Sequence, residues 1–489
     1  MATRVVDPKA PVRTWPDYAA LWRWHFYAGL LCLPFFCWLA ITGSLYLFRP
    51  DIEAWLDRPY ENLQLSAARA LPSAEAEAAV RAVPGSTFSR YEPPATPTGA
   101  AQVVVAQGGH LFRVYVHPTS LTPLKVGRDD HRPMELISHL HGQLLMGTPG
   151  SVVVEMAGSW GVIMIVTGLC LWFPRSSWRL AGVVYPRLSK GGRMFWRDLH
   201  AVTGLWICTV TLFLLLSGLP WASSWGNYFT WLRNQWSVTA GAPDWSLGGK
   251  DEPLPTLATT RKAAADATQA HITSAEMAAM MPEHAQHAMT MGGHMMVMPA
   301  PSLRALDVVV PALLHLSVPR PLWVLPPSDG GHDWVVSSRI QDRPRRVSYA
   351  IDPATGAVTG RKGFDNDNVV NRAINVAIAT HEGHLFGRPN QAILLANALG
   401  VLLVTMSAAV MWWRRRPAHT LGAPKRAVRP RWPSMLALAC AIVMLTVMLP
   451  LFGASLVVVL LLEQLALPRW PAAQRWLGLE SSPLERRQA

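Results

Sequence analysis

Five long apolar runs constrain this chain more than any other feature of its sequence. They cover residues 26–48, 151–173, 202–221, 392–413 and 435–462. A transmembrane helix needs about 20 consecutive apolar residues, and every run reaches that length. In addition, half of the 489 residues are apolar and only 15% are charged, which excludes an ordinary soluble protein of this size. The sequence therefore predicts a membrane protein that crosses the bilayer several times.

Basic residues predict the orientation of these spans, because Lys and Arg collect in the short loops that remain in the cytoplasm. They precede the first span, fill the loop between the second and third, and follow the fourth: Arg13, Arg23, Arg175, Arg179, Arg187, Lys190, Arg193, Arg197, Arg414, Arg415, Arg416, Lys425, Arg426, Arg429 and Arg431. We therefore expect a cytoplasmic N-terminus. This topology accounts for the net charge of +13, so no nucleic-acid partner is expected.

Two histidine motifs recur along the chain. "ISHLHGQLLMG" (137–147) and "ATHEGHLFG" (379–387) each place a histidine, His141 or His381, ahead of a glycine and a long apolar run. "WRWHFYAGL" and "FWRDLHAVTGL" place His25 and His200 just after basic residues, at the start of the first and third spans. An internal duplication is the simplest account of both repeats.

The external segments each predict a small helix-plus-sheet module. In the first, "PSAEAEAAVRAVPG" has the spacing of a short helix, and "QVVVAQ" and "LFRVYVHP" alternate as paired strands do. In the second, "LDVVVPALLHL" is a helix candidate interrupted by Pro311. There, "WVVSSRI" and "RRVSYAIDPATGAVTGR" predict a hairpin with a turn near Asp352 and Gly356.

The predicted fold is a mainly α membrane protein, an internally duplicated bundle of four core spans with a C-terminal hydrophobic segment and two external α+β modules. In chain order we expect a cytoplasmic N-terminus (1–21), first span (22–49), first module (50–132), histidine-motif helix (133–150), second span (151–174), basic loop (175–198), third span (199–222), second module (223–380), histidine motif with fourth span (381–413), basic loop (414–433), hydrophobic segment (434–462) and tail (463–489). The hydrophobic segment could be one span or a hairpin around Pro450.

These motifs, in this order, resemble the PepSY-associated transmembrane proteins, to which some bacterial siderophore reductases belong. The resemblance is carried by "RWHFYAGL", "HLHGQLLMGTPG", "RDLHAVTGL", "YAIDPATGAVTGR" and "HEGHLFG", over roughly residues 20–465. The first module departs from the family pattern, because "VHPTSLTPL" stands where an Asp-Pro-x-Thr-Gly turn is usual. The resemblance implies PepSY-like modules on the periplasmic side of the bacterial inner membrane and a role in iron transport.

The four motif histidines predict two cofactor sites at two depths. A pair of neutral imidazoles on facing helices can hold a b-type haem, with one axial ligand on each face of the iron. We expect His25 with His200 at the cytoplasmic side and His141 with His381 at the external side, giving about two haems per chain. His139 and His384 form a reserve pair for the external site. A purely structural role as hydrogen-bonded interfacial residues remains the alternative.

A Met- and His-rich insertion, residues 271–299, suggests a second metal site. Thioether and imidazole ligands select soft ions such as Cu(I). The copper candidates in this stretch are His284, His287, Met291, His294 and Met295. A flexible insertion without a metal is an equal alternative.

Two classes of function follow. In the first, the protein is a haem-dependent oxidoreductase that takes electrons from a cytoplasmic flavoprotein or a quinol and reduces a ferric siderophore, another metal chelate or Cu(II). The chain has no nucleotide-binding motif of its own and no G-x-S-x-G or H-E-x-x-H motif, so any flavin belongs to a partner. In the second, it is a non-enzymatic scaffold in the lipid bilayer that binds a peptide, a peptidase or a metal ion.

Overall fold

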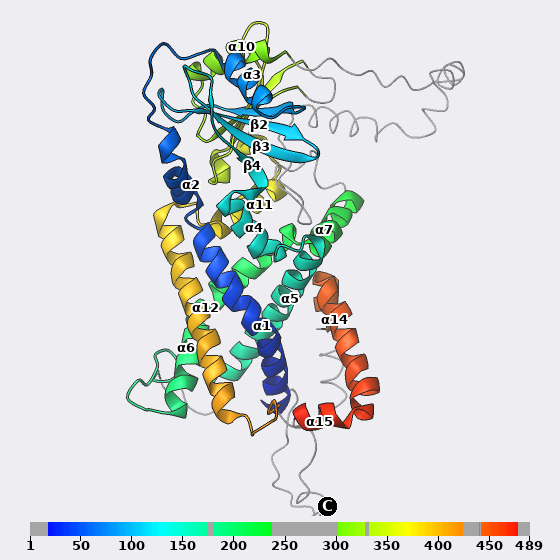
Figure 1. The fold of residues 1–489 in the computed structure, drawn as a ribbon. Helices are drawn as coiled ribbons and strands as arrows, with labels where there is room; N and C mark the ends of the chain where they lie inside the picture. Colours follow the sequence, from blue (N-terminus) through cyan, green and yellow to red (C-terminus); the bar gives the residue numbers. More distant parts are fainter. Residues whose placement is uncertain are drawn as a thin grey trace, which may run out of the picture. The chain divides into compact units, whose positions relative to one another are not determined.

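The computed structural model describes residues 18–174, 180–236, 302–327, 332–423, 440 and 442–477. They divide into two compact units, and the ribbon in Figure 1 follows the chain through both. The helical unit comprises residues 1–44, 140–228 and 392–489. The sheet unit comprises residues 45–139 and 229–391. Each unit is therefore assembled from segments that are far apart in the sequence.

The helical unit supplies the predicted membrane spans. Among the described residues, five helical stretches are long and apolar enough to cross a membrane. They are α1 (Tyr18–Tyr46), α5 (Thr148–Trp172), α6 (Arg193–Gly218), α12 (Arg388–Arg415), and α14 (Pro450–Leu461) together with its continuation to Arg469. The shorter helices α7 (Ser223–Trp236) and α15 (Pro471–Leu477) follow α6 and α14. The prediction of a mainly helical, multi-pass membrane protein is confirmed.

Small residues let the long helices approach one another closely. A Cβ atom on Gly161 of α5 would lie 2.5 Å from Phe36 of α1, and one on Gly400 of α12 would lie 2.6 Å from Ile207 of α6. Both glycines therefore mark close helix contacts, as small residues do in membrane bundles. The packed apolar core includes Ala28, Cys32, Phe36, Ala40, Trp160, Ile163, Ala398, Val401 and Phe452.

The C-terminal hydrophobic segment turns at Pro450. Residues 442–448 are helical, Leu449 leaves the helical conformation, and α14 starts at Pro450. The backbone of Ala423, just after α12, hydrogen-bonds to Leu477, whereas the carbonyl of Met448 accepts a hydrogen bond from Trp225, just after α6. The two ends of the segment therefore lie at the same end of the helical unit, which favours a hairpin over a single span.

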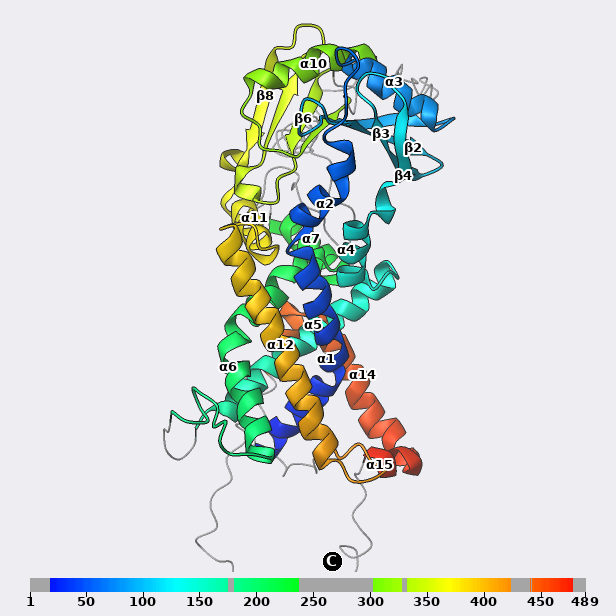
Figure 2. The ribbon, with the colours of Figure 1, turned by 60° about the vertical axis from the view of Figure 1, so that its left-hand side comes forward.

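The sheet unit contains one eight-stranded antiparallel sheet in the order β4-β3-β2-β1-β5-β6-β7-β8 (Figure 2). Its strands are β1 (Thr87–Glu92), β2 (Ala101–Gln107), β3 (His110–Val116), β4 (Pro123–Arg128), β5 (Leu322–Leu325), β6 (Trp334–Ser338), β7 (Val347–Ile351) and β8 (Val358–Gly363). The predicted pairs β2–β3 and β7–β8 are confirmed. The two external segments do not form separate sheets, however, because β1 pairs with β5 through Tyr91 and Val324. That pairing removes an exposed strand edge from each half.

The two helices predicted in the external segments pack on this sheet. They are α3 (Pro72–Ala82) and α10 (Leu306–Ala312), and Pro311 lies in the last turn of α10, which ends one residue later. The shared core includes Ala76, Ala79, Tyr91, Val103, Leu306, Val309, Trp334 and Val336. Asp307 at the start of α10 accepts hydrogen bonds from the backbone and hydroxyl of Ser73 in α3. Helices from both external segments therefore cover one continuous core.

Three further helices follow the first span and the two groups of strands. Helix α2 (Arg49–Asp57) follows the first span, α4 (Pro133–Gln143) follows β4, and α11 (Val369–His381) follows β8. Helix α4 crosses the boundary between the units, so its residues from 140 onward belong to the helical unit. The glycines after α4 and α11, Gly147 and Gly387, have φ of 64° and 63°. Glycine adopts this left-handed conformation without a side-chain clash, so the same backbone bend leads into α5 and into α12.

Candidate functional site

The helical unit brings together two histidines that the sequence pairs. His25 of α1 and His200 of α6 lie with their ring centres 6.2 Å apart and their planes at 79°. A metal ion bound by both rings, with bonds of about 2 Å and about 1 Å from each nitrogen to its ring centre, would separate the centres by roughly 6 Å. The spacing fits two ligands to one metal ion, and it also lies in the range of an edge-to-face contact between two rings.

Each of these rings is held by a neighbouring helix in the same way. The Nδ1 atom of His25 lies 3.0 Å from the carbonyl oxygen of Met164 and 3.3 Å from the hydroxyl of Thr167, both in α5. The Nδ1 atom of His200 lies 3.1 Å from the carbonyl oxygen of Val404 and 3.4 Å from the hydroxyl of Ser407, both in α12. A carbonyl and a hydroxyl three residues later thus form the seat of each ring.

These contacts define the tautomer. The Thr167 hydroxyl already donates to the carbonyls of Ile163 and Met164, so it accepts from His25. Nδ1 of His25 therefore carries the proton and donates. Neither Nε2 has a hydrogen-bond partner within the described part of the chain. A hydrogen-bonded Nδ1–H is what orients a metal-ligating histidine and leaves Nε2 as the ligand atom.

Space next to the ring pair is provided by glycines. A Cβ on Gly168 would lie 3.0 Å from Cε1 of His25, so only glycine fits beside that ring without a shift. Gly29 and Gly204 lie one helical turn after His25 and His200. A Cβ on Gly204 would meet nothing within 4 Å, and one on Gly29 only the Met164 sulfur at 3.9 Å. A flat ring system beside the histidines would meet no crowding at these two positions.

His141 occupies a second seat of the same kind in the helical unit. Its Nδ1 lies 2.9 Å from the hydroxyl of Thr42 in α1, and a Cβ on Gly43 would lie 3.2 Å from its Cε1. The Thr42 hydroxyl also contacts the carbonyl of Trp38 one turn earlier. Burial lowers the pKa of His141 to about 4, which keeps its imidazole neutral at pH 7 and able to bind a metal.

The sequence analysis missed these seats, although a pattern marks them. A hydroxyl residue followed by a small one occurs at Thr42–Gly43, Thr167–Gly168, Ser217–Gly218 and Ser407–Ala408. Ser217 follows His200 at the same spacing as Thr42 follows His25, and Ser407 follows His381 at the same spacing as Thr167 follows His141. The hydroxyls of Thr42, Thr167 and Ser407 each contact a histidine. The repeated dipeptide was the available signal.

The other candidate histidines belong to the sheet unit. His139 lies in α4, His381 is the last residue of α11, and His384 follows the bend at Gly383. Nε2 of His384 is buried and has no hydrogen-bond partner among the residues that the structure describes. Burial lowers its pKa to about 4. His384 is thus a neutral imidazole with an unsatisfied ligand atom, and the pairing across the external site stays a prediction.

The proposed copper ligands cannot be placed. His284, His287, Met291, His294 and Met295 all lie outside the described residues. Within the described ranges no group of three or more His, Cys, Asp or Glu side chains could hold a metal ion.

Comparison with known proteins identifies the family. A family model described as the PepSY-associated TM region matches residues 22–415. A search among curated proteins found no match. The matched region begins just before His25 and ends just after Ser407 and the last turn of α12, so it contains both ring seats and the whole sheet. Since this match covers most of the chain, the protein belongs to the PepSY-associated TM region family.

Proposed function

We propose that the protein is a di-haem b oxidoreductase of the bacterial inner membrane that reduces ferric siderophores in the periplasm. Electrons would come from a cytoplasmic flavoprotein or a quinol, and each ferric ion would accept one electron and leave its chelate as Fe(II). Haem would supply the one-electron chemistry. The chain's own residues would bind it, fix its orientation and exclude water.

The observation that carries this proposal is the ring pair His25–His200. Its spacing of 6.2 Å, its two donating Nδ1 atoms and the uncrowded glycines beside it match what axial ligation requires. Both rings leave Nε2 without a hydrogen bond among the described residues, so this atom is available as a ligand.

The second centre would use His141 with a histidine from the motif after β8. The repeat spacing makes His381 the counterpart of His141, whereas the buried and unsatisfied Nε2 favours His384. Along α1, His25 is separated from Thr42, which holds His141, by about 25 Å at 1.5 Å per residue. Two centres at this separation would lie near opposite faces of the roughly 30 Å hydrocarbon layer.

Internal duplication accounts for these parallels. Both halves have the same order of span, helix, four-stranded unit, histidine-motif helix and span. We propose that the two four-stranded halves are PepSY-like modules and that the basic loops hold the N-terminus in the cytoplasm. The sheet unit would then lie in the periplasm, where ferric chelates are met.

Absorption spectroscopy tests the proposal first. Full-length protein expressed with a haem precursor and purified in detergent should show a Soret band that shifts with dithionite, with about two b-type haems per chain in a pyridine haemochrome assay. Colourless protein that is folded, with a cooperative melting transition, would contradict the oxidoreductase and select the non-enzymatic scaffold.

Reoxidation kinetics then identify the acceptor. Dithionite-reduced protein should be reoxidised by a ferric hydroxamate in stopped flow, and ferrozine should trap the Fe(II) that is formed. His141→Ala should slow this reaction, and His315→Ala, outside the candidate centres, is the matched control. Reoxidation by Cu(II) but by no ferric chelate would make the protein a copper reductase, and reoxidation by neither would end the reductase proposal.

A further inference from the structure

The loop between α5 and α6 contains an ordered apolar segment. The structure describes this loop from residue 180 onward, and Figure 1 shows it in green beside the start of α6. Residues 180–188 read "LAGVVYPRL" and carry one charged side chain, Arg187, although basic residues flank them on both sides in the sequence. An uncharged stretch of this kind is unexpected in a basic loop that is surrounded by water.

The segment forms a tight turn from its own backbone. The amide of Gly182 donates to the carbonyl of Tyr185 at 2.7 Å. The amides of Val183 and Val184 donate to the carbonyl of Leu180 at 3.2 and 2.8 Å. Gly182 has a φ of 82°, a left-handed conformation that glycine adopts without a side-chain clash. The turn therefore satisfies these backbone groups without water.

Two tryptophan side chains attach the turn to the neighbouring helices. The indole N–H of Trp172, the last residue of α5, donates to the carbonyl of Val183 at 2.9 Å. The indole N–H of Trp206 in α6 donates to the carbonyl of Val184, also at 2.9 Å. Trp206 lies about one helical turn inside the apolar run 202–221, so the segment bends back alongside the membrane-spanning part of α6. Backbone groups at that depth need partners within the protein, which the indoles provide.

The one charge of the segment is paired with the protein. The guanidinium of Arg187 donates to both carboxylate oxygens of Asp198 in α6, at 2.6 and 2.9 Å. The Asp198 side chain is fully buried. A Cβ on Gly182 would lie 2.5 Å from the Arg187 guanidinium, so this group folds back over the turn. The charge of Arg187 is thus compensated by a carboxylate of the helical unit.

The outward side of the segment is apolar. Leu180, Tyr185 and Leu188 are 67%, 54% and 65% exposed, and the ring of Trp206 beside them is 68% exposed. Ordered apolar side chains that gather on a surface mark a contact with a membrane or another apolar partner. Tyr and Trp rings are typical of the boundary between acyl chains and headgroups. Since these residues lie beside two membrane spans, the partner that matches them is lipid.

We propose that residues 180–188 insert into the bilayer leaflet that adjoins the C-terminal end of α5, and that they bind lipid at the boundary between acyl chains and headgroups. The two indole hydrogen bonds hold the turn at this depth. Arg187 is tied to Asp198, two residues before His200, so the inserted loop fixes the start of α6 relative to the membrane. The proposal depends on the membrane spans and not on haem, so it holds or fails independently of the proposed function.

Spin-label accessibility in lipid nanodiscs tests the insertion. The full chain carries one nitroxide at Leu188→Cys, in a background whose five native cysteines are replaced by alanine and whose melting transition matches that of the native protein. Oxygen enters the hydrocarbon, whereas a polar nickel complex remains in water. The ratio of oxygen to nickel collisions should be several-fold higher at Leu188 than at Trp55→Cys, an exposed position on α2. Val457→Cys on α14 provides the reference for a lipid-facing position.

Two outcomes of this measurement would overturn the proposal. A ratio at Leu188 no higher than that at Trp55 would show that the loop lies in water. Poor access of both oxygen and nickel to Leu188 would show that another protein surface covers the loop.

A second variant tests how the turn is held. Trp206→Phe keeps an aromatic ring but removes the N–H that bonds to Val184, so nickel access to the label at Leu188 should rise several-fold. Trp413→Phe is the matched control, because Trp413 is 64% exposed and its indole donates no hydrogen bond within the described part of the chain. It should leave the collision ratio unchanged. Equal changes in the two variants, or no change in either, would overturn the role of the indole.

Discussion

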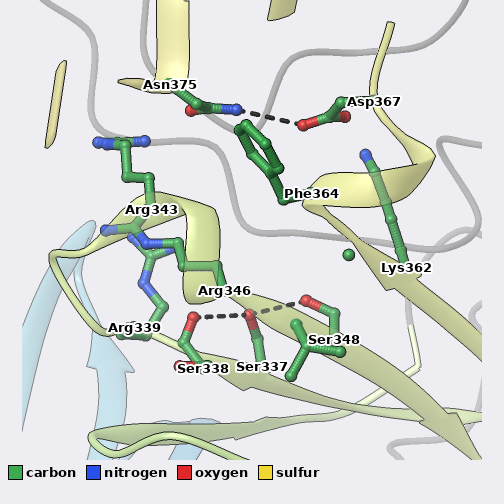
Figure 3. Close-up of a pocket in the computed structure, with 12 residues that line it drawn as sticks. Ser337, Ser338, Arg339, Arg343, Arg346, Ser348, Lys362, Phe364, Asp367 and Asn375 are labelled. Atoms are coloured by element: carbon green, nitrogen blue, oxygen red, sulfur yellow. Dashed lines mark hydrogen bonds between the residues drawn. The ribbon is translucent and has the colours of Figure 1, made fainter. Parts of the chain in front are cut away.

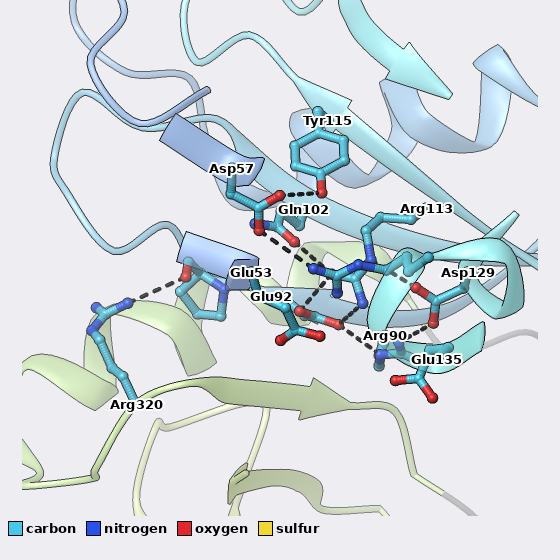
Figure 4. Close-up of polar contacts among 12 residues, drawn as sticks. Glu53, Asp57, Arg90, Glu92, Gln102, Arg113, Tyr115, Asp129, Glu135 and Arg320 are labelled. Carbon is cyan, nitrogen blue, oxygen red and sulfur yellow. Dashed lines mark hydrogen bonds and ion pairs between the residues drawn. The ribbon is translucent and has the colours of Figure 1, made fainter. Parts of the chain in front are cut away.

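The helical unit and the sheet unit both repeat a local pattern, but they treat the repeat differently. In the helical unit, His25 and His200 keep the same residue type and the same kind of seat, a carbonyl with a hydroxyl three residues later. In the sheet unit, the positions that match when β3 and β7 are counted back from the turns that follow them have diverged. They hold Ser348, whose hydroxyl donates to Ser337 (Figure 3), and Arg113, which lies inside an ion network with Glu92 and Asp129 (Figure 4).

This difference indicates which residues must stay equivalent in the two halves of the chain. In the proposed haem centre a metal would be ligated from two sides and would need an equivalent ligand from each half, so neither histidine could diverge alone. A sheet joined edge to edge needs only backbone pairing between its halves, here through β1 and β5, and its side chains are free to differ. We infer that the helical unit works as a symmetric pair and that the sheet halves have separate roles.

The largest expected effect is the loss of a haem centre. His25→Ala and His200→Ala should each remove the same one of two haems completely, because both rings would ligate one iron, and the remaining haem should keep its spectrum. Haem content and redox titration of each purified variant measure this. Different centres lost in the two variants, or loss of all haem from a protein that remains folded, would show that the two histidines do not act as a pair.

The next largest effect separates the two halves of the sheet. Arg113→Met should destabilise β3 and β4 by about 3–5 kcal/mol, because it leaves buried Glu92 and Asp129 short of a partner. Lys362→Met should cost less than about 1 kcal/mol, because Lys362 forms no ion pair among the described residues and its removal leaves no buried carboxylate short of a partner. Hydrogen exchange of the β3–β4 and β7–β8 peptides measures both. Similar costs in the two halves would break the comparison.

Lowering the pH should destabilise the first half of the sheet before the second. Although burial alone would raise the pKa of Glu92 and Asp129, Arg113 and Arg90 hold both folded pKa values below their usual range. The stability that the two carboxylates contribute is therefore present above about pH 4 and is lost as the pH falls below it. Hydrogen-exchange protection factors of β3–β4 should therefore decline between about pH 4 and pH 2 before those of β7–β8 do. A simultaneous decline would indicate that the ion network does not control the stability of the first half.

The spans and the hairpins could be predicted from sequence because each depends on one-dimensional patterning. Apolar length marks α1, α5, α6 and α12, and alternation marks β2 with β3. The pairing of His25 with His200 was also accessible, since both follow basic residues at the start of a span. These features depend on residues close together in the chain.

The seats are harder to predict. A threonine or serine within an apolar span commonly bonds to the carbonyl one turn earlier, as Thr42 and Thr167 do, so only the repeated dipeptide, at matched spacing from the histidines, marks the seats. The β1–β5 junction is a backbone pairing with no side-chain signature. The divergence of the two sheet halves depends on register, which places Ser348 where its counterpart is Arg113.

Removing the hydroxyl from either ring seat should weaken haem retention less than loss of a histidine does, and by a similar amount in both seats. Thr167→Val and Ser407→Ala each remove one hydroxyl that contacts a donating Nδ1 but leave the carbonyl in place. Outer partners of this kind change metal affinity by about 10–100-fold, so both variants should weaken haem retention within that range. Competition for haem with apomyoglobin measures it, with Ser455→Ala as the control. An effect in only one variant would show that the two seats are not equivalent.

The smallest expected effect concerns the turns after β3 and β7. Leu121 and Gly356 hold the same place in these turns, with φ of 57° and 73°. The amide of Leu121 donates to the carbonyl of His117, and the amide of Gly356 donates to that of Asp352. Leu121 packs against the sheet core, whereas a Cβ on Gly356 would lie 3.3 Å from Val308 of α10.

Gly356→Leu should therefore destabilise the fold by about 1–2 kcal/mol, because leucine is strained in the left-handed conformation and its Cβ would crowd Val308. Leu121→Gly should change stability by less than about 1 kcal/mol, because relief of the backbone offsets the lost packing and the added chain entropy of glycine. Hydrogen exchange of the two hairpins measures both changes, and equal tolerance at the two positions would mean that the turns, unlike the strands, have not diverged.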